Sequence, residues 1–168
     1  MELCDFPVFK GLNPTQTRNF TSACTTREHT AGTEIITRGK HGDTLFFLLE
    51  GQLKVFIPQG GGDQLLAEFQ PPAIFGEMEL LTERPRVASV VAVTDVKVAL
   101  IPFDAVHMQI HDGDTATLKV MFNVATIIAN RLEAVNNKLL EIATTTKNGV
   151  QSQELRNFQT KLFSEWSF

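Results

Sequence analysis

Two residues near the middle of the chain, Gly76 and Arg86, have the types and the spacing to bind a small anion. Arg86 supplies a planar, permanently charged guanidinium that can pair with phosphate oxygens two at a time. Gly76 lets the main chain approach an anion closely, and a short helix expected over 77–82 would direct its first N–H groups toward that anion. The stretch FGEMELLTERPRVASV, which begins at Phe75, therefore predicts a phosphate site.

A 3′,5′-cyclic phosphate on a ribose needs one further group, an acceptor for the ribose 2′-hydroxyl. Glu77, just inside the expected helix, can accept that hydrogen bond. Pro85 stiffens the backbone before Arg86 and brings the arginine back opposite Gly76. These residue types fit a cyclic phosphate that is held by a cation, by main-chain donors and by one carboxylate.

Glu79 lies inside the same stretch and could oppose a bound phosphate. Two unit charges about 5 Å apart, at an effective dielectric near 20, interact by about 3 kcal/mol, which corresponds to about two decades of affinity. The Glu79 carboxylate either points to solvent and leaves the site usable, or fills the site as a built-in anion. A further alternative is that Arg86 is a structural residue, salt-bridged to Glu77 or Glu79.

Short strands must position this stretch. From about residue 27 to about residue 103, runs of four to eight apolar and β-branched residues alternate with Gly, Asp and Pro. Strands spaced so closely predict an antiparallel sandwich, jelly roll or barrel rather than a parallel α/β sheet. The six expected strands lie within 32–39, 44–51, 52–59, 64–70, 87–94 and 96–102.

The run GGGD, from Gly60 to Asp63, lacks the Lys-Ser/Thr pair of a P-loop. It is therefore interpreted as the tip of a hairpin.

Residues 6–26 are expected to form a short helical lead-in to the strands. Asn13 is a candidate N-cap and Pro14 suits the first helical position. Phe20 and Cys24, four residues apart, would share one face of this helix.

After Asp104 the pattern changes to that of a long helix, expected over about 115–142. Apolar residues alternate at steps of three and four, which is the a/d pattern of a coiled coil. A helix of about 40 Å exceeds the diameter of the β-domain, so the pattern favours a homodimer, the alternative being a helix packed on its own domain alone. The expected seam consists of Leu118, Met121, Ala125, Ile128, Leu132, Val135, Leu139 and Ile142.

The last part of the chain divides into a polar linker over 143–152 and an amphipathic helix over 153–168. The linker contains Asn148-Gly149, which stops a helix. Leu155, Phe158, Leu162 and Trp166 would share one face of the final helix. This face either docks on the same dimer or serves as a recognition helix for a protein partner.

The composition limits the classes of function. A formal net charge of −4 gives no general attraction to nucleic acid or to anionic lipid. The first residues have no apolar core of a signal peptide, and no stretch approaches the ~18 to 20 apolar residues of a membrane span, so we expect a cytoplasmic protein. The two cysteines are too few for a disulfide scaffold or a cysteine-rich zinc site.

Catalytic and metal-binding arrangements are not recognisable in the sequence. The four histidines, His29, His41, His107 and His111, are scattered rather than closely spaced as metal ligands would be. No nucleophile and general base can be assigned to one another from the sequence. We therefore expect no enzyme activity, no metal and no cofactor.

The stretch from Phe75 resembles the phosphate-binding cassette of the cyclic nucleotide-binding domain family. Gly76, Glu77, Leu80, Arg86 and Ala88 fit its pattern, including the ten-residue step from Gly76 to Arg86. The segment before it, GTEIITRGKHGDTLFFLLEGQLKVF, is similar to the family's first hairpins, with Gly32, Gly39, Asp43 and Gly51 at the turns, and the long helix resembles the dimerising helix of the bacterial members. The resemblance covers about residues 6–142.

The resemblance implies a mainly β fold with helices. We expect an antiparallel β jelly roll with N-terminal helices and a long C-terminal dimerisation helix, together forming one domain over 1–142. It also implies a cyclic nucleotide as ligand, with cAMP expected because Val87 offers no hydroxyl to a guanine amino group. The implied ligand-binding residues are Phe75, Gly76, Glu77, Met78, Glu79, Arg86, Val87, Ala88 and, toward the base, Asn136.

Three of these positions leave alternatives open. Family members that bind ligand usually have a small residue at the position of Glu79 and a small or hydroxylic residue at that of Val87. Asn136, or its neighbour Asn137, could pair with an adenine edge, or both could be solvent-facing flanks of the coiled coil.

Two functions are therefore expected as alternatives. One is a non-catalytic sensor that signals through its dimer helix and tail. The other is a degenerate fold that has lost its ligand to Glu79 and serves as a dimeric interaction scaffold. Direct DNA binding is not expected, because the 26 residues after Ile142 are too few for a helix-turn-helix domain and carry no basic cluster.

Overall fold

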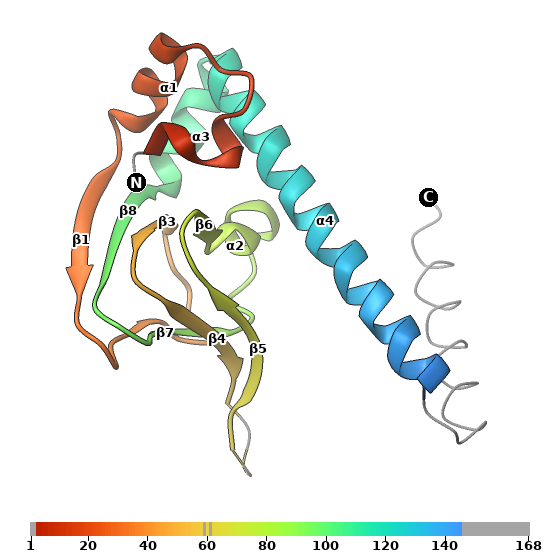
Figure 1. Cartoon of the computed structure of the whole chain (residues 1–168). Coiled ribbons are helices and arrows are strands. Elements are labelled where there is room, and N and C mark those ends of the chain that lie inside the picture. Colours follow the sequence, from red (N-terminus) through yellow and green to blue (C-terminus); the bar gives the residue numbers. More distant parts are fainter. Residues whose placement is uncertain (1–2, 59, 61, 146–168) are drawn as a thin grey trace. The chain divides into compact units, whose positions relative to one another are not determined.

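Two antiparallel sheets of four strands each form the body of the molecule (Figure 1). The computed structural model describes residues 3–58, 60 and 62–145, with the main chain alone at 138–139 and 141–145. One sheet has the order β1-β8-β3-β6 and the other the order β2-β7-β4-β5. The strands are β1 (Thr25–His29), β2 (Glu34–Ile36), β3 (Thr44–Glu50), β4 (Leu53–Ile57), β5 (Gln64–Phe69), β6 (Ala73–Phe75), β7 (Ser89–Ala92) and β8 (Val96–Pro102).

The expected jelly roll with flanking helices is confirmed, and each of the six expected runs holds a strand. Two further strands, β1 and β6, were not predicted. β6, Ala-Ile-Phe, is apolar but only three residues long, and β1, TTREH, is polar and has no buried residue. Both form because a neighbouring strand supplies their hydrogen bonds: β8 pairs with β1, and β3 pairs with β6.

The helices lie before, within and after the strands. They are two short 3-10 turns (Leu3–Asp5 and Pro7–Phe9), α1 (Pro14–Thr21), α2 (Glu77–Thr82), α3 (Phe103–His111) and α4 (Thr115–Thr145). Asn13 caps α1 as expected: its side chain accepts a hydrogen bond from the Gln16 N–H, and the Gln16 side chain accepts one from the Asn13 N–H. The expected extension of α1 to Cys24 is wrong, because the helix ends at Thr21.

The sandwich core lies between the two sheets. Eight fully or nearly buried side chains form it: Ile36, Leu48, Leu53, Phe75, Val90, Ala92, Val96 and Val98. A second cluster joins the N-terminal segment to β3, where Phe47 contacts the rings of Phe6 and Phe9 at centroid distances of 5.6 and 5.9 Å. This aromatic packing attaches the helical lead-in to the sheet that also carries β6.

The chain separates into two compact units, Met1–Val124 and Ala125–Phe168. Within the first unit, the start of α4 buries Ala116, Val120 and Val124, which recur every four residues on one face. Asn123 donates from its side chain to the main-chain oxygens of Val8 and Lys10. The first turns of α4 are thereby held by the N-terminal segment.

In the second unit, α4 continues to Thr145, past its expected end at 142. The linker and the final helix expected over 143–168 lie from residue 146 onward outside the described residues. Within the described part of the chain, no helix has both the length and the apolar character needed to cross a membrane.

Candidate functional site: a buried arginine with a built-in carboxylate

A sharp turn between β6 and α2 prepares the place for Arg86. Gly76 adopts a left-handed conformation with φ of 84°, which ends β6 and starts α2. Glu83, at φ of 55°, ends α2 in the same way, and the chain then runs through Pro85 to Arg86 before β7. The order of turn, short helix and arginine expected from the sequence is confirmed.

The Arg86 backbone is tied to the segment between β2 and β3. Its N–H donates to the Lys40 oxygen at 2.9 Å, and its own oxygen accepts from the Gly39 N–H at 2.8 Å. This pair of hydrogen bonds works like a short piece of sheet, although no strand is assigned there. These two hydrogen bonds position the Arg86 main chain independently of the contacts of its side chain.

The guanidinium lies between two glycines. A Cβ on Gly76 would come within 2.6 Å of Arg86 Nη1, and a Cβ on Gly42 would also collide with the guanidinium. Any side chain at either position would push the arginine away, so both glycines are required by this close approach.

Main-chain oxygens and a carboxylate satisfy the guanidinium. Nη1 donates to the Gly76 oxygen at 2.8 Å and Nη2 donates to the Thr44 oxygen at 2.9 Å. Nε lies 2.7 Å from Glu79 Oε2. All three side-chain nitrogens of Arg86 are therefore paired with protein oxygens, and the residue is 8% exposed.

Glu79 turns inward and fills the site from α2. Besides Arg86, its carboxylate accepts the Gly42 N–H, at 2.8 Å to Oε1 and 3.0 Å to Oε2. The Nδ1 atom of the exposed His41 ring lies 3.2 Å from Oε1. Of the alternatives for Glu79, the inward carboxylate paired with Arg86 is the observed one, and the solvent-facing carboxylate is not.

The charges around Arg86 are unbalanced toward the negative. Burial lowers the pKa of the Arg86 guanidinium, while the negative charges of Glu79, Asp43 and Glu77 act to raise it. The Phe103 ring also lies under the guanidinium, 5.5 Å from its centroid to Cζ. Three carboxylates therefore act on one permanent cation, and Glu79 is in direct contact with it.

The expected site residues fall into three groups. Gly76, Glu79 and Arg86 meet in direct contact. Phe75, Glu77 and Ala88 are buried beside them, with Phe75 stacked on Phe46 at a centroid distance of 4.9 Å. Met78 and Val87 are about half exposed, and their contact with a ligand remains a prediction.

The expected base contact, Asn136, lies in the second unit, and its side chain is partly exposed. Its role toward a ligand remains a prediction. The dimer seam on α4 also remains a prediction. Leu118, Leu132 and Val135 are between 38% and 56% exposed, and the side chains of Leu139 and Ile142 lie outside the described ones.

Sequence reasoning missed three contributors to the site, namely His41, Gly42 and Thr44. They belong to the segment KHGDT, which was expected to form a turn at Asp43 and to start a strand at Thr44. A hint was available, because a glycine just before a buried strand suggests a close approach of two main chains. Its partner, Arg86, is 44 positions away, and nothing local names it.

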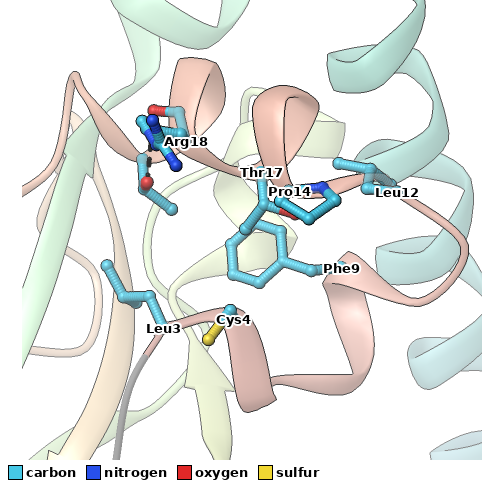
Figure 2. A pocket seen from close by; sticks show the side chains of 8 residues that line it. Leu3, Cys4, Phe9, Leu12, Pro14, Thr17 and Arg18 are labelled. Atoms are coloured by element: carbon cyan, nitrogen blue, oxygen red, sulfur yellow. Dashed lines mark hydrogen bonds between the residues drawn. The ribbon is translucent and has the colours of Figure 1, made fainter.

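A separate hollow of about 520 Å³ lies at the N-terminal helices (Figure 2). Leu3, Phe9 and Leu12 form apolar walls and Arg18 lies at its edge. None of the residues around Arg86 lines it. Among the described residues, no three His, Cys, Asp or Glu side chains are placed to hold a metal ion.

Comparison with known families decides the identity of the fold. The model of the cyclic nucleotide-binding domain matches residues 26–112, which include both sheets, α2 and Arg86. The chain belongs to the cyclic nucleotide-binding domain family. The resemblance found in the stretch from Phe75 is confirmed for the family and for the fold.

Relatives of this cyclic nucleotide-binding domain are diverse proteins. Glutaminase 2 of Bradyrhizobium diazoefficiens is 42% identical over 117 residues, 68% of this chain and 18% of that protein. The cAMP-dependent protein kinase regulatory subunit of Colletotrichum orbiculare is 34% identical over 97 residues, 58% of this chain and 24% of that subunit. The chain thus spans less than a quarter of either relative.

Among solved structures, the catabolite activator protein of Thermus thermophilus is similar, with a TM-score of 0.70 and 30% identity. The match covers 79% of this chain and 61% of that one. A domain shared by such different proteins is expected when function resides in sites attached to a common fold.

Proposed function

We propose that this domain is a non-catalytic regulatory sensor that binds a cyclic nucleotide, with cAMP as the favoured ligand. The observation that carries the proposal is the buried guanidinium of Arg86, already facing an oxyanion at its Nε side. A buried arginine beside a main-chain N–H donor, here that of Gly42, is an arrangement that suits phosphate recognition. The cAMP-dependent kinase subunit and the catabolite activator protein among its relatives support the choice of ligand class.

The roles of individual residues follow from position. Arg86 would pair with the phosphate, Glu77 would accept the ribose 2′-hydroxyl, and Gly76 would let the main chain approach. Phe75, Met78, Val87 and Ala88 would border the sugar and phosphate, and Asn136 would reach the base.

Calorimetric titration with cAMP, cGMP and a cyclic dinucleotide tests the proposal directly. We expect heat with cAMP and loss of that heat in Arg86→Ala, while Arg84→Ala, which removes an exposed charge two residues earlier, should bind as the unchanged protein does. Heat that persists without Arg86 would place the ligand elsewhere.

A dimer through α4 is part of the same proposal. Leu118, Leu132 and Val135 leave apolar surface on the helix, and a second copy would cover it. Ile128→Asp should shift the sedimenting mass toward monomer, whereas Asn130→Asp, on an exposed position of the helix, should not. Sedimentation of the unchanged protein as a monomer would contradict the dimer.

The second candidate, a scaffold without ligand, is favoured by one observation. Glu79 already neutralises Arg86 and occupies the Gly42 N–H. If this pair is permanent, none of the three nucleotides should produce heat in the unchanged protein, which should still sediment as a dimer.

A further inference from the structure

We propose that the Glu79 carboxylate and the ligand's phosphate are alternative occupants of one seat, so that Glu79 is a tethered competitor that sets the affinity of the domain. The seat consists of Arg86 Nε and the Gly42 N–H. This inference rests on the proposed function, and it adds the residue that regulates the site.

The contacts of Glu79 are those of a bound oxyanion rather than of a capping residue. One oxygen pairs with Arg86 Nε at 2.7 Å, and both oxygens accept the Gly42 N–H. A phosphodiester likewise carries one negative charge over two free oxygens, so the same cation and donor suit it. The Glu79 side chain is almost fully buried, so its carboxylate is held largely by these protein contacts.

The remaining nitrogens of Arg86 cannot substitute for Nε without loss. Nη1 donates to the Gly76 oxygen and Nη2 donates to the Thr44 oxygen. If either nitrogen turned to the phosphate, that oxygen would lose its hydrogen bond, which costs free energy. A phosphate that entered while Glu79 stayed would also be repelled by the Glu79 carboxylate, which lies 2.7 Å from Arg86 Nε. Simultaneous occupancy would weaken binding by about a hundredfold, so exchange is the favourable route.

Exchange also reaches beyond Arg86. Gly42 and His41 belong to the segment that follows β2, and Glu79 belongs to α2. The carboxylate therefore joins two segments that are far apart in the sequence. When Glu79 leaves, the Gly42 N–H must pair with the ligand or with water. The Gly42 amide is therefore the atom that reports the exchange.

The central test is the affinity for cAMP of the unchanged protein, Glu79→Gln and Glu83→Gln. A glutamine in place of Glu79 keeps the size of the side chain but not its charge, so we expect binding about tenfold to a hundredfold tighter. Glu83→Gln removes an exposed charge at the other end of α2 and should leave the affinity unchanged. Equal affinity of all three proteins would overturn the competition while leaving the sensor function intact.

Acetate provides a second, independent readout. In Glu79→Ala the seat has no tethered carboxylate, so sodium acetate should weaken cAMP binding in proportion to its concentration, relative to sodium chloride of equal ionic strength. The unchanged protein should show no difference between the two salts. Absence of any acetate effect in the alanine variant would mean that the Glu79 seat is not the phosphate seat.

The failures of the two proposals can be told apart. If no variant binds cAMP, although thermal unfolding shows that Glu79→Gln is folded, both the sensor function and the exchange are refuted. If all bind it equally, only the exchange is refuted. A nitrogen-15 NMR spectrum in which the Gly42 amide does not shift on saturation with cAMP would also contradict the exchange.

Discussion

Glu79 in α2 and Asp114 before α4 both accept main-chain N–H groups, but over very different distances in the chain. Asp114 accepts the N–H of Thr117 at 3.0 Å and its hydroxyl at 2.6 Å, only three residues away. Glu79 accepts the N–H of Gly42, 37 residues away. The first carboxylate serves its own helix, whereas the second joins separate elements and neutralises a buried cation.

The comparison teaches how a charge is to be interpreted. Asp114 is explained completely by the need of α4 for a cap. No local need explains why Glu79 is buried against Arg86, since a buried ion pair contributes little net stability compared with apolar residues. Charges whose positions the fold does not require are better candidates for function.

The largest expected effect is that of removing the cation. Arg86→Ala leaves the Glu79 carboxylate buried without its partner, and we expect a loss of about 3–5 kcal/mol in the free energy of unfolding. Urea denaturation measures it, with Arg84→Ala as the exposed control expected within about 0.5 kcal/mol of the unchanged protein. A loss as small as that of the control would show that Glu79 does not depend on Arg86.

A smaller effect is expected from the glycine beneath the guanidinium. Gly76→Ala strains a left-handed backbone and collides with Arg86 Nη1, so we expect a loss of about 2–3 kcal/mol. Gly113→Ala is a matched control, because Gly113 also has a positive φ, 74°, but nothing lies within 4 Å of its added Cβ. Equal losses in the two variants would mean that only the backbone conformation matters and that Arg86 gives way easily.

Removing the local carboxylate should cost less. Asp114→Ala deletes the cap of α4, which is typically worth about 1 kcal/mol. The control is Asp63→Ala, an exposed acidic residue in the β4–β5 hairpin. If Asp114→Ala costs as much as Arg86→Ala, the contrast between a local and a long-range carboxylate is wrong.

The smallest effect is the pH dependence of that cap. The hydrogen bond from the Thr117 hydroxyl lowers the pKa of Asp114 below its usual 3.8. The folded state therefore holds the charged form better, so the stabilisation is present above pH 3.8 and is lost as the pH falls through the lower, folded pKa. The difference in unfolding free energy between the unchanged protein and Asp114→Ala should narrow below pH 3.8, and a constant difference would contradict this.

Much of the fold could be predicted because its signals are local. Asn13 and Pro14 mark the start of α1, GGGD marks the tip of the β4–β5 hairpin, and the apolar runs mark six strands. β1 and β6 could not be predicted, since the residues of neither strand form a long apolar run. Their position in the sheet is set by pairing with β8 and β3, which are distant in the sequence.

The chain by itself determined which residues could meet a phosphate: an arginine ten positions after a glycine that must turn left-handed, with a short helix between them. Only the tertiary structure decided what Arg86 contacts. Glu79 could have pointed either way from α2, because a helical residue's direction relative to distant segments is not encoded in its neighbours. The Gly42 N–H and the Nε of Arg86, brought together by the approach of the segment after β2 to the arginine, turn the carboxylate inward.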